Sequence, residues 1–399
     1  LTCLSVFLTV AFGACTLEPT APGVEIFWDT TKTDLVARYD AAFNTLNGGQ
    51  GCSAFTNDDG TYAWSQSYLL HSLLDMFEAT QDTSYLDAFT AQANQVADNN
   101  DRLRGVSDYL GRSEIAWSAS RYSVNGERAS WLVDDSFIAE PLARFGTLVR
   151  KQRLTQYEHS AVRLLETAER AINKYVRLFR FNPANEQGQY MLEAGFPAAY
   201  VIDYPDSEMP LPLNHESAAG RLHLELWRAT GDPIHRDRAA ALGRRLKSHM
   251  TEEGAGYAWR YFGNDGDTLF FNSWSDISHG AMDVRFAAML AEEELVFDGA
   301  DLQRLSDTLF NQRVGRRFRR FVKGHERDLI SPDPKCGYIF NRAESDSAPL
   351  WLPVADGVLF EAVFDFVSDR LDEDVTTDPQ ILNGLSQIIY HYPDLGAPR

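Results

Sequence analysis

The chain has 399 residues, of which 44% are hydrophobic and 24% are charged, so it can bury a large core and is not a disordered polymer. Its 57 acidic residues outnumber 37 basic ones, which gives a formal net charge of −20 at pH 7. This charge argues against nucleic acid as the main partner, because phosphate binding depends on basic patches.

The first thirty residues predict export. Residues 1–15, LTCLSVFLTVAFGAC, form an apolar run that is too short to cross a bilayer and is typical of a signal sequence. The FGAC ending resembles a bacterial lipoprotein signal, in which Cys15 would carry the lipid; a buried strand or helix is the alternative. Residues 16–30, with prolines and threonines, predict a tether. We expect a periplasmic or outer-membrane-anchored lipoprotein that meets a membrane only through this anchor.

Residues 31–399 predict a single all-α domain built from helical hairpins. Two stretches, 66–99 and 215–250, place apolar residues at helical spacing and break at 81–82 and 231–233. With three looser copies, the first helices of the hairpins are expected to start near Gln66, Asp134, His215, Ser278 and Asp356. Together with a leading helix at 33–46, these hairpins approach the twelve helices of an (α/α)6 toroid, and an open helical solenoid is the alternative.

Other segments give weaker signals. Short strands are expected in loops such as 188–195 and 336–342, and the basic run 313–327 is expected to form an exposed outer helix. Beyond the signal, Cys52 and Cys336 could form one disulfide or remain two buried thiols. The sequence has no CxxC pair and no zinc-ligand spacing, so we expect neither a metal nor another cofactor.

The starts of the inner helices are the expected place for a binding site. In a toroid they converge at one end, where free N–H groups and helix dipoles favour anionic groups. Aromatic residues at these starts offer flat faces to sugar rings. The candidate substrate contacts from these starts and the segments before them are Trp64, Trp117, Trp131 and Asp134.

Three neighbouring stretches carry the reactive side chains expected at this end. They contain, in order, Asn214, His215 and Glu216; Tyr257, Trp259, Arg260 and Tyr261; and Trp274, Asp276 and His279. Adjacent helix starts and the loop between them would bring the three stretches together. Each side chain also has a packing alternative: Asn214 suits an N-cap, and His215 shares a helical face with leucines.

The Asn-His pair and the later tyrosine resemble the toroidal polysaccharide lyases that act on alginate and glucuronan. The resemblance covers roughly residues 60–370, although this chain reads LNHESA where one alginate lyase group has Asn-Asn-His-Ser-Tyr-Trp. It implies that Asn214 neutralises a substrate carboxylate, that His215 is the base, and that Tyr261 (or Tyr257) is the acid. The expected activity is metal-independent β-elimination on an acidic polysaccharide.

The chemistry of elimination suits these residue types. The C5 proton of a uronic acid becomes more acidic when Asn, Arg or His side chains hydrogen-bond the neighbouring carboxylate, which gives Arg260 and His279 a role beside Asn214. A histidine titrates near neutral pH and so suits the base. Glu216, Tyr257, Trp259 and Trp274 are expected to line the substrate.

Three alternatives remain open. A glycoside hydrolase would need two facing carboxyl groups, which Asp134 and Asp135 could supply with Asp276 or Asp356. A surface lipoprotein could bind glycans without cleaving them, and a uronate C5-epimerase shares the proton abstraction. Only a lyase gives an unsaturated uronate that absorbs in the near ultraviolet.

Overall fold

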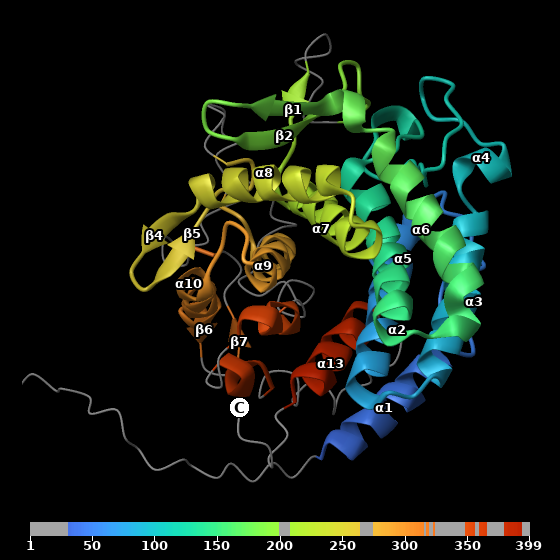
Figure 1. Cartoon of the computed structure of the whole chain (residues 1–399), viewed down its shortest axis with the longest axis horizontal. Coiled ribbons are helices and arrows are strands. Elements are labelled where there is room, and N and C mark those ends of the chain that lie inside the picture. Colours follow the sequence, from blue (N-terminus) through green and yellow to red (C-terminus); the bar gives the residue numbers. More distant parts are fainter. Residues whose placement is uncertain are drawn as a thin grey trace, which may run out of the picture.

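The computed structural model describes residues 31–198, 208–263, 274–314, 317–318, 322–323, 348–355, 359–364 and 379–392. The expected signal, the tether, Cys336, Asp356 and the expected strand at 336–342 lie outside these residues. Within them the helices follow one another around a ring, and the last, α13 (Pro379–His391), packs against the first, α1 (Lys32–Thr45) (Figure 1). The prediction of an all-α toroid of hairpins is confirmed.

Four helical hairpins make up most of the described ring. Each pairs an inner with an outer helix: α2 (Ser67–Thr80) with α3 (Ser84–Asp98), α5 (Leu132–Gln152) with α6 (Glu158–Asn173), α7 (Leu213–Thr230) with α8 (Pro233–His249), and α9 (Ile277–Glu292) with α10 (Gly299–Phe310). The inner helices are buried on almost every face, whereas an outer helix such as α6 buries a single apolar stripe. A helix buried all round must lie inside the ring.

The ends of the helices are set by local backbone chemistry. A capping box between Thr31 and Asp34 begins α1. Gln81 and Gly231 adopt left-handed conformations, with φ of 61° and 76°, and end α2 and α7. The carboxylate of Asp232 then accepts a hydrogen bond from the Ile234 N–H and begins α8. The predicted breaks at 81–82 and 231–233 are therefore confirmed.

Strands are short and lie in the connections between helices. They form a three-stranded sheet of β1 (Phe179–Asn182), β2 (Gln187–Leu192) and β3 (Met209–Pro210), and two hairpins, β4 (Thr251–Glu253) with β5 (Gly256–Ala258) and β6 (Arg313–Val314) with β7 (Arg317–Phe318). The strand expected at 188–195 is confirmed as β2. The outer helix expected over the basic run 313–327 is wrong where the structure describes that run, because β6 and β7 pair there as antiparallel strands.

A short 3₁₀ helix, Ala348–Val354, and a helical segment at 359–364 lie between α10 and α13 in the chain. The 3₁₀ helix packs against both α9 and α13 and so carries the ring from one to the other. A four-residue helix, α4 (Asp101–Arg104), and a π-helical turn, Tyr62–Gln66, precede α5 and α2.

The inner helices run in the same direction, because each is joined to the next through an antiparallel outer helix. Near their starts, the rings of Trp131 and His215 lie 6.1 Å apart. Near their ends, Arg144 on α5 forms a 2.7 Å ion pair with Asp75 on α2, and the Thr147 hydroxyl donates to the Glu225 carboxylate at 3.0 Å. We call the end with the helix starts the N-terminal rim and the other end the C-terminal rim.

Candidate functional site

Two consecutive carboxyl groups stand in the first turn of α5, at the N-terminal rim. Trp131 precedes the helix and provides no side-chain cap. The acidic residues of the first turn therefore interact favourably with the positive end of the helix dipole. The two side chains, Asp134 and Asp135, point about 100° apart around the helix, because an α-helix has 3.6 residues per turn. They therefore meet different neighbours.

Asp135 is held by three donors. One carboxylate oxygen accepts the Trp117 backbone N–H at 2.9 Å, and the other accepts the Tyr175 hydroxyl at 2.7 Å and pairs with the Lys174 ammonium at 2.7 Å. Tyr175 and Lys174 follow α6, and Trp117 belongs to the loop before α5. Asp135 thus ties three segments of the chain together at this rim.

Asp134 is buried but much less satisfied. Its side chain leaves the residue only 3% exposed, and one carboxyl oxygen has no hydrogen-bond partner among the described residues. Burial, followed by the nearby charge of Asp135, raises the pKa of Asp134 to about 8, although Arg121 acts in the opposite direction. Asp134 therefore holds its proton at neutral pH.

A third carboxyl group of the rim was not singled out from the sequence. Asp101, at the start of α4, accepts the Ser118 N–H at 3.0 Å, and burial raises its pKa to about 6. Lys174 and Tyr175 were missed as well. Both follow an outer helix, where no local pattern in the sequence indicates that they turn toward α5.

The first predicted stretch, residues 214–216 at the start of α7, is enclosed by protein. His215 is 7% exposed, its Nδ1 has no hydrogen-bond partner among the described residues, and burial together with His279 lowers its pKa to about 3. Asn214 lies inside the helix rather than at its N-cap, which is Pro212, and its amide donates to the Met282 sulfur at 3.9 Å. The buried imidazole is a weak base at neutral pH.

Glu216 has a structural position. Its two carboxylate oxygens accept the Tyr190 N–H of β2 at 3.0 Å and the Arg245 Nε–H of α8 at 2.9 Å. These bonds tie the start of α7 to the sheet and to the outer helix. They give Glu216 a structural role, and the substrate contact predicted for this residue stays a prediction.

The second stretch (257–261) and the third stretch (274–279) do lie close to the first, as predicted. The Tyr261 carbonyl accepts the Leu213 N–H at the start of α7, and the rings of Tyr261 and His279 lie 4.9 Å apart. Asp276 caps α9 and approaches His279 Nδ1 at 2.6 Å. Burial raises the pKa of Asp276, but its hydrogen bonds and the charge of His279 outweigh burial and hold that pKa well below its usual range.

The predicted aromatic contacts divide into two groups. Trp117 and Trp259 are each 1% exposed, and their indole N–H groups donate to the Val96 carbonyl and the Asp283 carboxylate. Trp131 is also buried. These enclosed rings argue against the platform role predicted for them, whereas Trp64 and Trp274 stay partly exposed, and the Arg260 guanidinium lies 4.4 Å over the Trp274 ring.

Tyr257 lies apart from the site. Its hydroxyl donates to Asp301 at 2.8 Å and its backbone N–H to the Thr308 hydroxyl, and both partners are on the outer helix α10. The structure therefore brings Tyr261, and not Tyr257, to the N-terminal rim. Of the two tyrosines that the sequence left open as the acid, Tyr261 is the one that lies beside α7 and His279.

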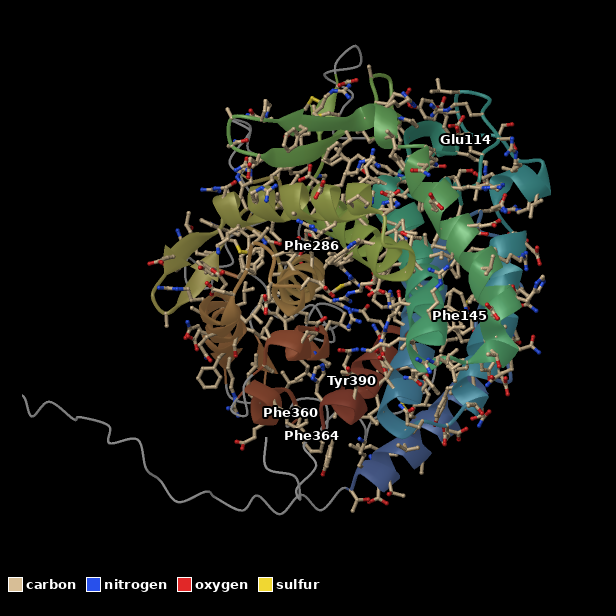
Figure 2. The ribbon with its side chains drawn as sticks, in the orientation of Figure 1. Glu114, Phe145, Phe286, Phe360, Phe364 and Tyr390 are labelled. Carbon is tan, nitrogen blue, oxygen red and sulfur yellow. The ribbon has the colours of Figure 1, made fainter. Side chains whose placement is uncertain are left out.

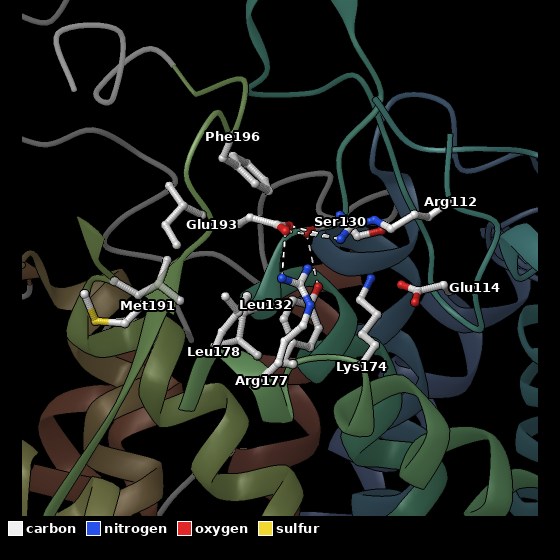
Figure 3. A pocket seen from close by; sticks show the side chains of 13 residues that line it. Arg112, Glu114, Ser130, Leu132, Lys174, Arg177, Leu178, Met191, Glu193 and Phe196 are labelled. Carbon is white, nitrogen blue, oxygen red and sulfur yellow. Dashed lines mark hydrogen bonds and ion pairs between the residues drawn. The ribbon is translucent and has the colours of Figure 1, made fainter. Parts of the chain in front are cut away.

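A small pocket is lined in part by Lys174 and Tyr175, the two side chains that contact Asp135 (Figure 3). Lys174 lines it, as do Arg112 and Arg177, which both pair with Glu193 at 3.1 and 2.7 Å. Its volume is about 30 Å³, which holds a water molecule rather than a sugar. The pocket supports the Asp135 network and is too small to be the substrate site.

Within the described ranges, no group of three or more His, Cys, Asp or Glu side chains could hold a metal ion. In the same part of the chain, no helix combines the length and apolar character needed to cross a membrane. Cys52 is a free thiol in this structure, and its possible partner Cys336 lies outside the described residues.

Comparison with known proteins gives structural matches alone. No family model matches the chain, and no curated protein matches it in sequence. The GH76A α-1,6-mannanase of Salegentibacter sp. HEL1_6 matches with a TM-score of 0.53 at 11% identity, over 90% of this chain and 98% of its own. A family 88 glycosyl hydrolase from Bacteroides vulgatus matches with a TM-score of 0.53 at 8% identity, over 91% and 99%.

At these identities the likeness shows the fold, which is the α/α toroid. Both neighbours are hydrolases, so they support a toroid but not the alginate-lyase type that the sequence resembled. An inactive variant of the mannanase, in which two consecutive aspartates are replaced, matches equally well and is bound to α-1,6-mannotriose.

Proposed function

We propose that this chain is a glycoside hydrolase with Asp134 and Asp135 as its reacting carboxyl pair. One observation carries the proposal: a buried carboxyl group with a pKa raised to about 8 stands next to a second carboxyl group held by three donors. Glycosidases use two carboxyl groups, one of which donates a proton to the leaving oxygen. Contrasting surroundings are how proteins assign such roles to neighbouring acids.

In this proposal Asp134 is the proton donor. At neutral pH it keeps a proton that it can transfer to the glycosidic oxygen, while Asp135 attacks the sugar or activates a water molecule. The partly exposed indole of Trp64 lies beside Asp134 and offers a stacking face. The substrate is a polysaccharide or oligosaccharide, which suits the exported location predicted from residues 1–15.

The structural neighbours support both the class and a first substrate. The mannanase that shares the fold is described as inactive after replacement of two consecutive aspartates, and its inactive variants hold α-1,6-mannotriose or the tetrasaccharide. This chain also has two consecutive aspartates, at the start of an inner helix. An α-1,6-linked mannan is therefore the first substrate to test.

A polysaccharide lyase is the second candidate, because Tyr261 and His279 meet at the start of α7. Its substrate would be an acidic polysaccharide of the alginate or glucuronan type. The lowered pKa of His215 weighs against this candidate: an imidazole with a pKa of about 3 is unprotonated at pH 7, but it is too weak a base to favour removal of a C5 proton.

One incubation separates the two candidates. The purified protein is given α-1,6-mannan, alginate or glucuronan, and both reducing ends and near-ultraviolet absorbance are followed. The hydrolase is supported by new reducing ends without absorbance, and Asp134→Asn must abolish them. An absorbing product from a uronate polymer would replace the hydrolase by the lyase, and binding without new ends would leave a glycan-binding protein.

A further inference from the structure

A large cavity opens at the C-terminal rim, at the opposite end of the ring from Asp134. It has a volume of about 820 Å³ and is lined by the last turns of α2, α5, α7, α9 and α13. Its wall on α5 includes Arg150, which is about 24 Å along the helix from Asp134 at 1.5 Å per residue. Ligand pockets commonly have volumes of about 300–1,000 Å³.

Two ion-pair networks form the wall. Arg144 pairs with Asp75 at 2.7 Å and also with Glu78. On the other side, Arg228 pairs at 2.7–2.9 Å with three acidic side chains, those of Glu225, Glu292 and Glu293. Altogether five basic and five acidic side chains line the cavity, so its formal charge is balanced and it does not select an ion by its net field.

Several buried polar atoms of the wall have no partner in the described part of the chain. They are Nη1 of Arg144, Nε of Arg285 and Oε1 of Gln387, and all three residues line the cavity. Gln387 is 1% exposed, and its amide nitrogen donates to Asp75, which fixes the direction of the free oxygen. These atoms lie behind the accessible surface of the wall, and burying donors and acceptors without partners is unfavourable, so the wall has unused hydrogen-bonding capacity.

The chemistry of these atoms indicates the ligand. Guanidinium groups of Arg144, Arg228 and Arg285 and carboxylates of Glu78, Glu225 and Glu292 line the same cavity, and a hydroxyl group can both accept from the former and donate to the latter. The rim also carries an aromatic side chain, Tyr390, which is 43% exposed at the end of α13 (Figure 2). Carboxylates, guanidinium groups and an exposed ring together match the hydroxyl groups and the apolar face of a sugar.

We propose that the C-terminal rim holds a second binding site, for a neutral mono- or oligosaccharide. The site is separate from the carboxyl pair at the N-terminal rim and performs no chemistry. In a protein that acts on long glycans, such a site would keep a chain or a product attached at the far side of the ring. The binding itself depends on the cavity and stands whether or not the chain proves to be a hydrolase.

The test measures binding and does not depend on turnover. Isothermal titration and crystal soaking use the Asp134→Asn protein with mannose, glucose, galactose and α-1,6-mannotriose, and with inorganic phosphate as the ionic probe. We expect saturable sugar binding with density beside Gln387 and Tyr390. The double substitution Arg285→Gln and Tyr390→Ala should weaken that binding by about tenfold or more, as lost polar and stacking contacts predict.

The matched control is Phe181→Ala on β1, which removes an exposed aromatic ring elsewhere on the surface and should leave binding unchanged. Circular dichroism checks that the double variant is folded. Phosphate bound in preference to every sugar, water or the chain's own side chains filling the cavity, or equal sugar affinity in the double variant would each overturn the proposal. If the wild-type protein shows no glycosidase activity but the sugar binding is intact, only the proposed function is overturned.

Discussion

The starts of α5 and α7 are two neighbouring inner-helix starts with opposite chemistry. Both bury a titratable side chain in the first turn, within the same rim. Burial disfavours the charged form of each, so it raises the pKa of Asp134 to about 8 and lowers the pKa of His215 to about 3. The same environment thus produces a neutral acid and a neutral base.

Only one of these neutral groups is useful near pH 7. A protonated carboxyl group with a pKa of about 8 can give its proton to a leaving oxygen, whereas an imidazole with a pKa of about 3 accepts a proton poorly. The comparison therefore assigns the expected chemistry to the start of α5 and not to the Asn214-His215 pair at the start of α7, which the sequence had favoured.

The largest expected effect comes from comparing a substitution at the start of α5 with one at the start of α7. Asp134→Asn should lower kcat by about 10²–10⁴-fold, because it removes the proton donor and keeps the shape of the side chain. His215→Gln, on α7, should change kcat by less than about tenfold. Release of reducing ends measures both variants. A deeper loss in the histidine variant than in the asparagine variant would reverse the assignment.

Thermal unfolding checks that the Asp134→Asn variant is folded and also tests the burial of Asp134. The folded pKa of Asp134 lies above its unfolded value, so its contribution to stability is complete below about pH 3.8 and is lost as the pH rises through about 8. Asparagine does not titrate. The midpoint of thermal unfolding of Asp134→Asn should therefore fall less than that of the wild type between pH 5 and pH 9.

The next effect is in the pH profile of the wild-type enzyme. Because the proton donor must be protonated, kcat should fall on the alkaline side with an apparent pKa near about 8, by tenfold per pH unit above it. The measurement is initial rate at saturating substrate from pH 5 to pH 10. A rate that keeps rising through pH 9 would show that no group of raised pKa has to stay protonated.

A smaller effect is expected from the donors that hold Asp135. Lys174→Met and Tyr175→Phe each remove one contact to its carboxylate, and kcat should fall by about tenfold with little change in KM, because the group is misplaced rather than lost. The matched control is Arg180→Met, which breaks an exposed ion pair with Glu208 and should leave kcat unchanged. Equal effects at all three positions would make the loss a general one.

The architecture could be predicted from the sequence because the signals are local. Periodic apolar residues and breakers at Gln81 and Gly231 define the hairpins, and their repetition indicates the ring. The position of Tyr261 beside α7 also followed, since neighbouring helix starts had to converge. These features depend on residues that are close in sequence.

The ring interior could not be predicted in this way. Charged pairs spaced by four residues are typical of solvated helix faces, yet Glu140 and Arg144 on α5, and Arg221 and Glu225 on α7, are all buried in the ring. Arg221 pairs with Glu140 at 2.6 Å across the two helices. Which charges meet inside depends on how the helices face one another, and one helix's sequence does not contain that information.

The carboxyl pair was visible but was ranked behind the histidine for the same reason. The sequence analysis named Asp134 as a substrate contact and the pair as carboxyl groups of a possible hydrolase, but acidic residues at a helix start are also favoured by the helix dipole alone. What distinguishes them is burial and the donors from Lys174, Tyr175 and the Trp117 backbone, which come from segments far along the chain.

The smallest expected effect tests the other half of the comparison. The folded pKa of His215, about 3, lies below the value near 6.5 of an unfolded histidine, so its contribution to stability is present above pH 6.5 and is lost as the pH falls toward 3. The loss amounts to at most about 1.4 kcal/mol per pH unit for one histidine. His215→Gln should flatten the acid side of the stability curve, measured by urea unfolding from pH 7 to pH 4.

His159→Gln, at an exposed position of α6, is the control and should keep the wild-type slope. If His215→Gln also keeps that slope, the buried imidazole takes up a proton inside the folded ring as easily as in water. Burial would then fail to separate the two helix starts, because a histidine that titrates near neutral pH could serve as the base of an elimination. The assignment of the chemistry to α5 rather than α7 would lose its physical basis.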